Sequence, residues 1–394
     1  MDPPPDMVAA IISVGPHDFQ RTLWETGSMN MDLIAWAGKL TAQEEPYHML
    51  KMLWQPKRFR PPLEGIPLAQ TVNAAYQGKA DWLQNWIRNS ESENDYYKPM
   101  KLGQSLEKAN MPILLISGWY DLFSDQTLEQ YFRLRERGCN VALTVSKGSH
   151  NAAVGNPEAT KDTLAWLEEH LALRNKTPRE NPVKYYVTGA EEWRTATEFP
   201  PAPKTYTLYL QRAGKLGTET AIDGDQYSRF VFDPRNPTPT IGGNKLGMDG
   251  GRVDDTALAE RSDVTTFTTE PLQEDFEFIG KPTVTLNHTT DNPFADLFVR
   301  ISEVNEKGRS YNISEAYQRL DPKRDTDSVT LSLSWCAHRF ARGHKIRLIV
   351  AGGSHPHYAR NLGVENLDNT RSDMKSVEHT ISHGPGKDSK LTFQ

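Results

Sequence analysis

The chain has 394 residues, of which 37% are hydrophobic, and its 45 basic and 51 acidic side chains give a formal net charge of −6. A chain of this length buries more than one hydrophobic core, so we expect more than one domain. The charges are mixed with no stripe rich in Lys and Arg, which argues against nucleic acid as a partner, and no apolar stretch is long enough to cross a bilayer, which argues against a membrane protein.

The start of the chain and its cysteines bear on the compartment. Residues 1–5 (MDPPP) have neither the basic segment nor the apolar segment of an export signal. Cys139 and Cys336 lie in different halves of the sequence and form neither a disulfide framework nor a cluster of metal ligands. We therefore expect a cytoplasmic protein that needs no metal and no other cofactor.

The first strand is predicted from an apolar run at 7–14, which is followed by Gly15 and Pro16. A continuous run of this kind predicts a strand that is buried on both faces, parallel to its neighbours and internal to a sheet. It looks like the middle of a sheet whose earlier strands are absent. The next such run starts only at 113, much farther along than a parallel crossover requires, so we expect an insertion between the two strands.

Residues 19–108 form this insertion, which is rich in aromatic residues and helix formers. Apolar side chains recur at helical spacing around 33–40, 48–54 and 82–87, and prolines separate these groups. We expect a helical cap over the carboxyl end of the sheet, where it closes a site and selects the apolar part of a substrate. The alternative for each tryptophan is a place in the core of the cap itself.

Two further strand predictions each lead to a polar residue. The run at 113–116 is followed by Asp121, and after a helical pattern at 128–137 a second run at 141–145 leads to His150. Parallel strands end at the same edge of a sheet, so both side chains should meet there. This is the order of the last two members of a Ser-Asp-His triad in an α/β-hydrolase. We predict Asp121 and His150 as catalytic residues; the alternative is a pair that stabilises the sheet end without catalysis.

The second half of the chain has a different texture. After a helical pattern at 157–173 that would cover the sheet, short β-rich runs alternate with clusters of Gly, Pro, Asn and Asp from residue 181 onward. Runs of this kind predict an antiparallel sandwich, best described as a jelly roll. The runs lie at 183–187, 205–210, 283–286, 297–301, 329–333 and 345–350.

The predicted fold class is therefore α/β plus all-β. A partial α/β-hydrolase sheet at 1–18 and 109–175 carries the helical cap at 19–108, and a C-terminal jelly-roll β-sandwich follows at 181–394. No internal repeat and no low-complexity tract interrupts this division.

Six short motifs, each weak by itself, form a specific set because of their order and spacing. They are Gly118–Asp121 with Phe123, Gly148–His150, Val187–Gly189 leading to Trp193, Ala295–Arg300, Gly308–Ser314, and Ala351–Ser354 leading to Arg360 and Asn361. The set resembles the family of cocaine esterases, X-prolyl dipeptidyl peptidases and α-amino-acid ester hydrolases, which are CocE/NonD-type α/β-hydrolases. The resemblance extends from near residue 8 to near residue 365.

The resemblance implies an α/β-hydrolase core, a helical cap and a C-terminal jelly roll. It also implies hydrolysis of a small ester or amide with an apolar acyl part, or hydrolysis of the dipeptidyl-peptidase type. By resemblance, Asp121 would orient and charge-stabilise the base, and His150 would shuttle the proton. Side chains of the core and cap would bind the small-molecule substrate. The candidates are His17, Trp24, Trp119, Tyr120 and Phe123.

The departure from the family concerns the nucleophile. No G-x-S-x-G elbow occurs in the 394 residues, and in the family it lies just before the strand that we place at 7–14. The chain would therefore start after its own nucleophile and lack the oxyanion donors, and we expect it to be inactive as a hydrolase in this form. The alternative is a non-hydrolytic protein on the same scaffold, either a small-molecule-binding protein, a pseudoenzyme or a biosynthetic acid–base enzyme such as a cyclase. No other serine is expected to replace the nucleophile: Ser28 and Ser124 lie in loops without the surroundings of an elbow. Ser117 lies inside the strand before the acid, and Ser149 adjoins the base but should point elsewhere.

Two other histidines have a spacing that could ligate a metal. His355 and His357 would point from one face of a strand, but no third ligand stands at a useful distance in the sequence. We interpret them as surface or loop histidines.

The strand at 7–14 would also leave an unpaired, apolar edge. A bare edge of this type recruits another strand, so a homo-oligomer through this edge is the assembly that the sequence suggests.

Overall fold

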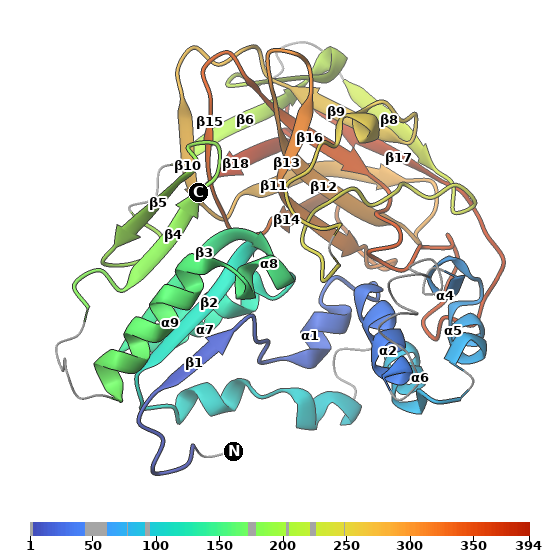
Figure 1. The fold of residues 1–394 in the computed structure, drawn as a ribbon. Helices are drawn as coiled ribbons and strands as arrows, with labels where there is room; N and C mark the ends of the chain where they lie inside the picture. Colours follow the sequence, from blue (N-terminus) through green and yellow to red (C-terminus); the bar gives the residue numbers. More distant parts are fainter. Residues whose placement is uncertain are drawn as a thin grey trace.

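The computed structural model describes residues 3–43, 61–76, 78–90, 95–171, 179–201, 205–220, 226–247 and 249–394. Figure 1 shows a sheet flanked by helices, a group of helices beside it, and a large β-sandwich above both. This arrangement confirms the predicted fold class, a partial α/β-hydrolase sheet with a helical cap followed by a jelly-roll sandwich. The predicted helix at 48–54 lies outside the described residues. In the described part of the chain, no helix is long and apolar enough to cross a membrane.

The first sheet contains five strands in chain order. They are β1 (Ala10–Ser13), β2 (Ile113–Tyr120), β3 (Val141–Ser149), β4 (Val183–Val187) and β5 (Glu192–Ala196). β1 to β4 run parallel, and β5 returns antiparallel to β4. β2 is buried along its whole length, as expected for an apolar strand in the middle of a parallel sheet.

Helices cover both faces of this sheet. Leu115 of β2 belongs to the core under α7 (Ser124–Glu136), whereas its neighbour Leu114 belongs to the core under α9 (Pro157–His170). Successive residues of a strand point to opposite faces, so β2 contributes to both cores. The sequence predicts both helices and both are confirmed; the short helix α8 (His150–Val154) follows β3 directly.

β1 differs from its prediction in burial. The sequence predicts a strand that is buried on both faces, but β1 is only half-buried and lies at the edge of the described sheet. Its parallel direction is confirmed. The N–H of Ala10 donates to the carbonyl of Pro112, just before β2, and the N–H of Val14 donates to the carbonyl of Ile116 in β2. Because backbone groups point to alternate sides of a strand, the N–H and C=O groups of Ile11 and Ser13 face away from the sheet. An apolar run carries no information on whether a strand has one neighbour or two.

β4 and β5 lie within the range 181–394 that the sequence assigns to the sandwich, yet they extend the first sheet. Val183 of β4 stands opposite Leu143 of β3 in parallel register. Thr188, just after β4, donates its N–H to the Ala337 carbonyl of the sandwich at 3.0 Å. A short apolar run fits either sheet, so its sequence does not specify its neighbour. The domain boundaries as a whole stay a prediction.

The cap is a group of short helices around one core. They are α1 (Phe19–Trp24), α2 (Asp32–Ala42), α4 (Pro61–Glu64), α5 (Leu68–Tyr76) and α6 (Asp81–Arg88), with the 3-10 helices η2 (Asp95–Met100) and η3 (Gly103–Glu107). The predicted helices at 33–40 and 82–87 are confirmed by α2 and α6. Trp82 stands edge-on to both Trp36 and Trp86, with ring centroids 6.2 and 4.6 Å apart. These three tryptophans therefore pack on one another within the cap.

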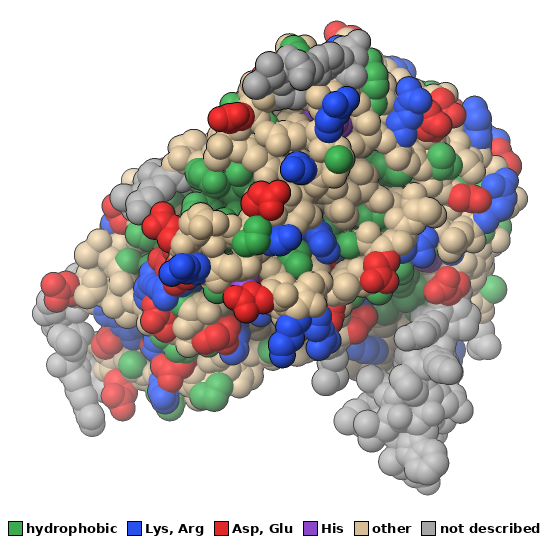
Figure 2. Space-filling model, turned by 90° about the horizontal axis from the view of Figure 1, so that it is seen from above, with side chains coloured by type: hydrophobic (Ala, Val, Ile, Leu, Met, Phe, Trp, Pro, Cys, Tyr) green, Lys and Arg blue, Asp and Glu red, His purple; other side chains and the backbone are tan. Residues whose placement is uncertain are grey.

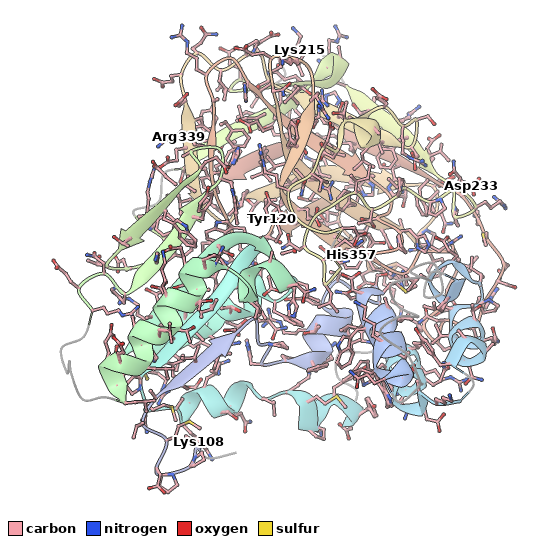
Figure 3. All side chains as sticks on the ribbon, in the orientation of Figure 1. Lys108, Tyr120, Lys215, Asp233, Arg339 and His357 are labelled. Carbon is pink, nitrogen blue, oxygen red and sulfur yellow. The ribbon has the colours of Figure 1, made fainter. Side chains whose placement is uncertain are left out.

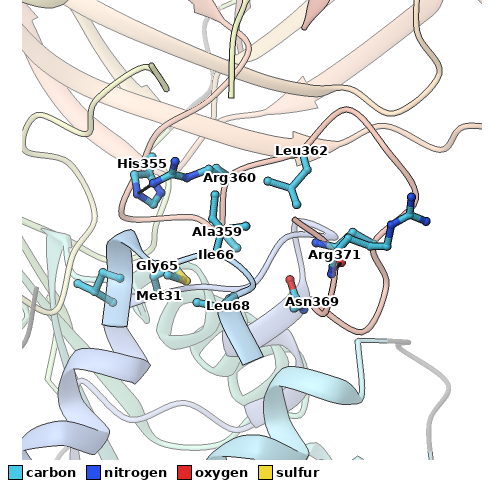
Figure 4. Close-up of a pocket in the computed structure, with 12 residues that line it drawn as sticks. Met31, Gly65, Ile66, Leu68, His355, Ala359, Arg360, Leu362, Asn369 and Arg371 are labelled. Carbon is cyan, nitrogen blue, oxygen red and sulfur yellow. Dashed lines mark hydrogen bonds between the residues drawn. The ribbon is translucent and has the colours of Figure 1, made fainter. Parts of the chain in front are cut away.

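The cap contacts the sandwich along a seam that Figure 4 shows in close-up. Ala69 donates its N–H to the Asn369 carbonyl at 3.1 Å. The Arg360 guanidinium donates to the Glu64 carbonyl at 3.2 Å and lies 3.1 Å from His355 Nε2. These contacts fix the cap against loops of the sandwich rather than against its strands.

The sandwich is built from a long path of mostly antiparallel strands. Its bounds are β6 (Tyr206–Gln211), η4 (Arg212–Gly214), β7 (Lys215–Gly217), β8 (Tyr227–Phe232), α10 (Thr256–Ala259), β9 (Val264–Thr268), β10 (Phe276–Gly280), β11 (Thr283–Thr290), β12 (Asp296–Val304), β13 (Ser310–Arg319), β14 (Ser328–Ser332), β15 (Cys336–Phe340), β16 (Lys345–Ala351), β17 (Val377–Ser382) and β18 (Lys390–Phe393). The order is β13-β12-β16-β9-β7-β6-β18-β11-β17-β8, with β14 beside β11 and β10 paired with β15. Side chains from β6, β11, β12, β16 and β17 share one apolar core, which makes the curved path a sandwich.

One buried charge cluster braces this sandwich. Arg300 of β12 has no exposed surface, and its guanidinium donates to Glu315 Oε2 at 2.5 and 2.9 Å. It also donates to the Ile241 carbonyl at 2.7 Å and lies 3.5 Å from Asp255 Oδ2. A charge in this position is tolerated only with such compensation, so the cluster holds Glu315 in place.

The surface carries both signs of charge. On the face that Figure 2 shows, basic and acidic side chains are interspersed, and no patch of one sign dominates. This agrees with the small net charge of −6. Such a face gives little electrostatic steering to a highly charged partner.

Candidate active site

Asp121 and His150 meet at the carboxyl edge of the first sheet. Asp121 is the first residue after β2, and His150 is the first residue of α8, directly after β3. His150 Nδ1 lies 2.8 Å from Asp121 Oδ1. The structure therefore brings the two predicted residues into contact, and their catalytic role stays a proposal.

Two glycines allow the ends of β2 and β3 to approach so closely. A Cβ atom on Gly118 would lie 2.1 Å from the Gly148 carbonyl oxygen, which is far inside van der Waals contact. The pairing register also shifts between Gly118 and Tyr120. Any larger residue at Gly118 would push β3 away from β2, and would move His150 relative to Asp121.

Asp121 is held at both of its oxygens. Its side chain has 0% exposure, and the Ser117 hydroxyl donates to Oδ2 at 3.0 Å while Oδ1 faces His150. The Ser124 N–H donates to the Asp121 carbonyl at 3.0 Å and closes the loop after β2. A buried carboxylate with two donors is well compensated, so it can orient an imidazole without moving.

His150 keeps one ring nitrogen open. Its side chain is 18% exposed, and Phe123 packs edge-on against the ring with centroids 5.3 Å apart. Among the described residues, Nε2 has no hydrogen-bond partner, whereas Nδ1 faces the carboxylate. An Nδ1 proton donated to Asp121 leaves Nε2 as the basic nitrogen. The pair can therefore accept a proton from a group that lies within hydrogen-bond distance of Nε2.

The predicted substrate-binding residues of the core differ in their access. Phe123 contacts the ring of His150. The Trp119 indole N–H donates to the Tyr186 carbonyl at 2.7 Å, and the Tyr120 hydroxyl donates to the Asn312 carbonyl at 3.1 Å. Trp119 and Tyr120 are buried with their polar atoms in use, and their role in substrate binding stays a prediction.

His17 and Trp24 are also held by their neighbours. His17 Nε2 lies 3.2 Å from Glu129 Oε1 on α7, and burial lowers the pKa of this histidine. The Trp24 indole N–H donates to the Tyr97 hydroxyl at 3.1 Å in the cap core. Neither side chain contacts the Asp–His pair within the described ranges, and their role in binding stays a prediction.

A cleft of about 350 Å³ opens beside the segment that follows Asp121. Ser124 belongs to its core wall, Asn30 to its cap wall, and Tyr317 and Tyr358 to its sandwich wall. A volume of this size accommodates a small molecule. The sequence does not reveal the cleft, because its walls come from three segments that are far apart in the chain.

His357 lines this cleft and makes a second Asp–His pair with Asp32. The distance between His357 Nδ1 and Asp32 Oδ2 is 3.3 Å, and the histidine is only 2% exposed. His355 and His357 do lie on a loop, but their interpretation as surface histidines is wrong, because both are buried. The cap covers this loop: the Met31 N–H, for example, donates to the His357 carbonyl at 2.8 Å. Figure 3 shows His357 between the sandwich and helices α1 and α2.

Leu246 lies between Asp32 and the residue that follows His150. Its N–H donates to Asp32 Oδ2 at 2.8 Å, and its carbonyl accepts from Asn151, the neighbour of His150, at 3.4 Å. Burial opposes ionisation of Asp32, but the charge and hydrogen bond of His357, with help from Lys245 and Leu246, lower the pKa of this carboxyl overall. A loop of the sandwich therefore contacts Asp32 of the second pair and the neighbour of His150 in the first.

The described residues offer no cluster for a metal. Within them, no group of three or more His, Cys, Asp or Glu could hold a metal ion. His355 contacts Arg360 instead, and burial together with that charge lowers the pKa of His355 to about 4. A nitrogen in this setting is held neutral, next to a cation that repels a metal.

The fold and the pair at its sheet edge define an α/β-hydrolase with a cap and a C-terminal sandwich. Comparison with family models agrees: residues 1–152 match X-Pro dipeptidyl-peptidase (S15 family), and residues 175–392 match the X-Pro dipeptidyl-peptidase C-terminal non-catalytic domain. The chain belongs to this family of serine hydrolases.

Individual relatives are distant. A cocaine esterase of Rhodococcus sp. (strain MB1 Bresler) is 23% identical over 355 residues, which are 79% of this chain and 61% of the esterase. The crystal structure of an aminopeptidase from a marine sediment Thaumarchaeota archaeon matches with a TM-score of 0.82 at 18% identity. This match covers 100% of the present chain and 73% of the aminopeptidase chain. The structure of an α-amino acid ester hydrolase matches with a TM-score of 0.80 at 17% identity, and the match covers 99% of the present chain and 73% of the hydrolase chain. These structures show a shared fold, and the chain spans 61% of the length of the esterase.

Proposed function

We propose that this chain supplies the acid–base half of a serine hydrolase that acts on a small ester or amide, with His150 as the base and Asp121 as the acid that orients it. The observation that carries this proposal is the 2.8 Å contact between His150 Nδ1 and Asp121 Oδ1. In such a triad, Nε2 of the histidine takes the proton of the nucleophile and returns it to the leaving group, while the carboxylate stabilises the imidazolium.

We propose an apolar acyl group for the substrate. Phe123 packs against the His150 ring, so the surface beside the base is apolar. An apolar surface at this place favours an apolar acyl part. The similar protein named cocaine esterase acts on an ester, which supports the same class of small-molecule substrate.

The nucleophile would have to come from outside these residues. The 394 residues contain no G-x-S-x-G sequence. Removal of a nucleophile lowers the rate by several orders of magnitude, and loss of one oxyanion donor raises the barrier by about 3 kcal/mol. The chain by itself should therefore retain the acid and base and be inactive toward esters.

A second candidate is a non-hydrolytic protein on the same scaffold. The cleft that His357 lines favours it, because this cleft has polar groups of its own and does not include the His150 side chain. The protein would then bind a small molecule, as a pseudoenzyme does, or perform acid–base chemistry such as cyclisation. If the protein only binds a ligand, His150→Ala should leave the affinity for that ligand unchanged. If His150→Ala abolishes a reaction of the protein, the protein performs acid–base chemistry.

Hydrolysis of p-nitrophenyl butyrate tests the first proposal, with His150→Gln as the matched control. We expect the chain and the control to hydrolyse this ester at the same background rate. Activity that the control lacks would overturn the claim that the nucleophile lies elsewhere. The pair itself is tested by NMR: the Nδ1 proton of His150 should give a downfield signal that is lost in Asp121→Asn. An unchanged signal in Asp121→Asn would refute the assignment of acid and base.

We also propose association through the free edge of β1. The backbone groups of Ile11 and Ser13 face away from β2, and Met7 and Val8 just before the strand are exposed. A strand of a second copy could pair there. Light scattering after size exclusion should show a mass that rises with protein concentration; a monomer at every concentration would contradict this proposal.

A further inference from the structure

Two polar groups of the cleft beside the Asp121 loop have no hydrogen-bond partner among the described residues. They are Nε2 of His357 and the hydroxyl of Tyr358, and both residues line the cleft. The two rings stand edge to face with centroids 4.3 Å apart. Tyr358 is also stacked on Tyr317 at 4.1 Å, so its ring has little freedom to turn. The fold thus holds two neighbouring polar groups at a cleft wall without using them.

Asp32 determines what His357 offers to the cleft. Its Oδ2 lies 3.3 Å from Nδ1, without a hydrogen bond between them, and accepts the N–H of Leu246 at 2.8 Å. The negative charge of this nearby carboxylate favours a proton on Nδ1, which leaves the lone pair on Nε2. His357 therefore presents a hydrogen-bond acceptor.

Tyr358 offers a donor. Burial raises the pKa of its phenol well above the usual value, and the nearby charges of Glu315 and Asp32 raise it further. The hydroxyl therefore stays protonated at any ordinary pH. A protonated phenol without a partner donates to an acceptor oxygen that enters the cleft.

The charges around the cleft are already paired. The three pairs are Glu25 with Arg21 at 2.7 Å, Asp125 with Lys281 at 2.9 Å, and Glu315 with Arg300 at 2.5 Å. A charged ligand would need an opposite charge to replace its lost hydration. Because each carboxylate of these pairs already has a cation, these groups offer no unpaired charge to compensate a charged ligand.

We propose that this cleft binds a neutral group that donates and accepts hydrogen bonds at the same time, namely a carboxamide or a hydroxyl. Its N–H or O–H donates to His357 Nε2, and its oxygen accepts from the Tyr358 hydroxyl. A carboxylate has no proton for Nε2, and an ammonium has no lone pair for the phenol. This inference concerns recognition and goes beyond the hydrolase proposal, since it needs no turnover.

Three probes with one aromatic ring test it: benzamide, benzoate and benzylammonium. Each is titrated into the 394-residue chain and followed by protein-observed NMR. We expect benzamide to bind at least about tenfold more tightly than either charged probe, because only the neutral amide keeps both hydrogen bonds. Tyr358→Phe keeps the stacked ring and should weaken benzamide binding by about threefold to tenfold, the range for one hydrogen bond. Tyr227→Phe, at an exposed tyrosine of β8, is the matched control and should bind as the unaltered chain does.

Further variants separate this site from the catalytic pair. His150→Gln should keep full affinity for benzamide, and Asp32→Asn should lose affinity because Nε2 is no longer the preferred acceptor. If Asp32→Asn does not fold, the affinity of Tyr358→Phe for benzamide decides whether the proposal holds. The proposal is overturned if benzamide does not bind, if a charged probe binds more tightly, or if Tyr358→Phe leaves the affinity unchanged.

Discussion

The two Asp–His pairs of this protein are built in different ways: the first is joined by a hydrogen bond, whereas the second is a close contact without one. Asp121 and His150 stand at the ends of neighbouring strands of one sheet, 2.8 Å apart. Asp32 belongs to the cap and His357 to a sandwich loop, and they are 3.3 Å apart. The first pair depends on one sheet, whereas the second exists only where the cap is packed against the sandwich.

Access distinguishes the pairs further. The His150 side chain is 18% exposed, but that of His357 is only 2% exposed. A base that exchanges protons with a substrate must be reached by the reacting group. A group that only recognises a ligand can be buried deeply at the wall of a cleft. We therefore propose proton transfer for the first pair and recognition for the second.

The largest expected effect is on the sandwich wall of the cleft. Arg300→Met would leave Glu315 and Asp255 as uncompensated buried carboxylates. We expect the free energy of unfolding to fall by about 3–5 kcal/mol. Urea unfolding followed by tryptophan fluorescence measures this, with Arg212→Met at an exposed position as the control. Equal midpoints for the two variants would show that this cluster does not stabilise the sandwich wall of the cleft.

Asp32→Asn removes the charge of the buried carboxylate that faces His357 and accepts the Leu246 N–H, and should lower the free energy of unfolding by about 2–3 kcal/mol at neutral pH. The pKa of Asp32 is lowered in the folded protein, so its stabilisation is present above the unfolded value of about 3.9 and is lost as pH falls through the lower folded value. The difference from the unaltered chain should therefore shrink below about pH 4.

Urea unfolding at several pH values measures this difference. Asp325→Asn, on an exposed loop, serves as the control with no such dependence. A difference between Asp32→Asn and the unaltered chain that stays constant down to acid pH would mean that the Asp32 charge does not contribute.

Ser117→Ala weakens the first pair and should have a smaller effect. It removes the hydroxyl that donates to Asp121 Oδ2 at 3.0 Å, but it leaves the contact with His150. We expect a loss of about 1–2 kcal/mol in the free energy of unfolding. Ser328→Ala on β14 is exposed and should change stability by less than about 0.5 kcal/mol. If both serine variants behave alike, Asp121 does not depend on its second donor.

Tyr358→Phe should have the smallest effect on stability. Its hydroxyl bonds to no described residue, and the stacked ring is retained in phenylalanine. We expect the free energy of unfolding, measured by thermal unfolding, to change by less than about 0.5 kcal/mol. A large loss of stability would mean that the hydroxyl has a structural partner, and would remove the basis for assigning it to a ligand.

The first pair is predictable from the sequence because it follows from local order. An apolar run, Asp121, a helix, a second run and His150 specify two adjacent parallel strands, and such strands end at one edge. The second pair has no such pattern. Asp32 opens a cap helix and His357 sits in a distant loop, and only the packing of the cap on the sandwich joins them.

Strand neighbours are less predictable than strands. The runs behind β1 and β4 are apolar and predict strands correctly, but the predicted burial of β1 is wrong, and the sequence does not indicate that β4 pairs with β3. Backbone pairing is the same chemistry at every strand, so the choice of partner is decided by tertiary packing. For the same reason Trp24 and Trp119, both aromatic residues near predicted site elements, cannot be separated from core residues by sequence.

The most direct test of the central claim is the intact mass of the chain after incubation with a fluorophosphonate probe, which reacts with activated serines. The claim is that these 394 residues hold the acid Asp121 and the base His150 but no nucleophile. It predicts a mass that does not change. One covalent adduct per chain, located on a serine and absent from His150→Gln, would contradict it.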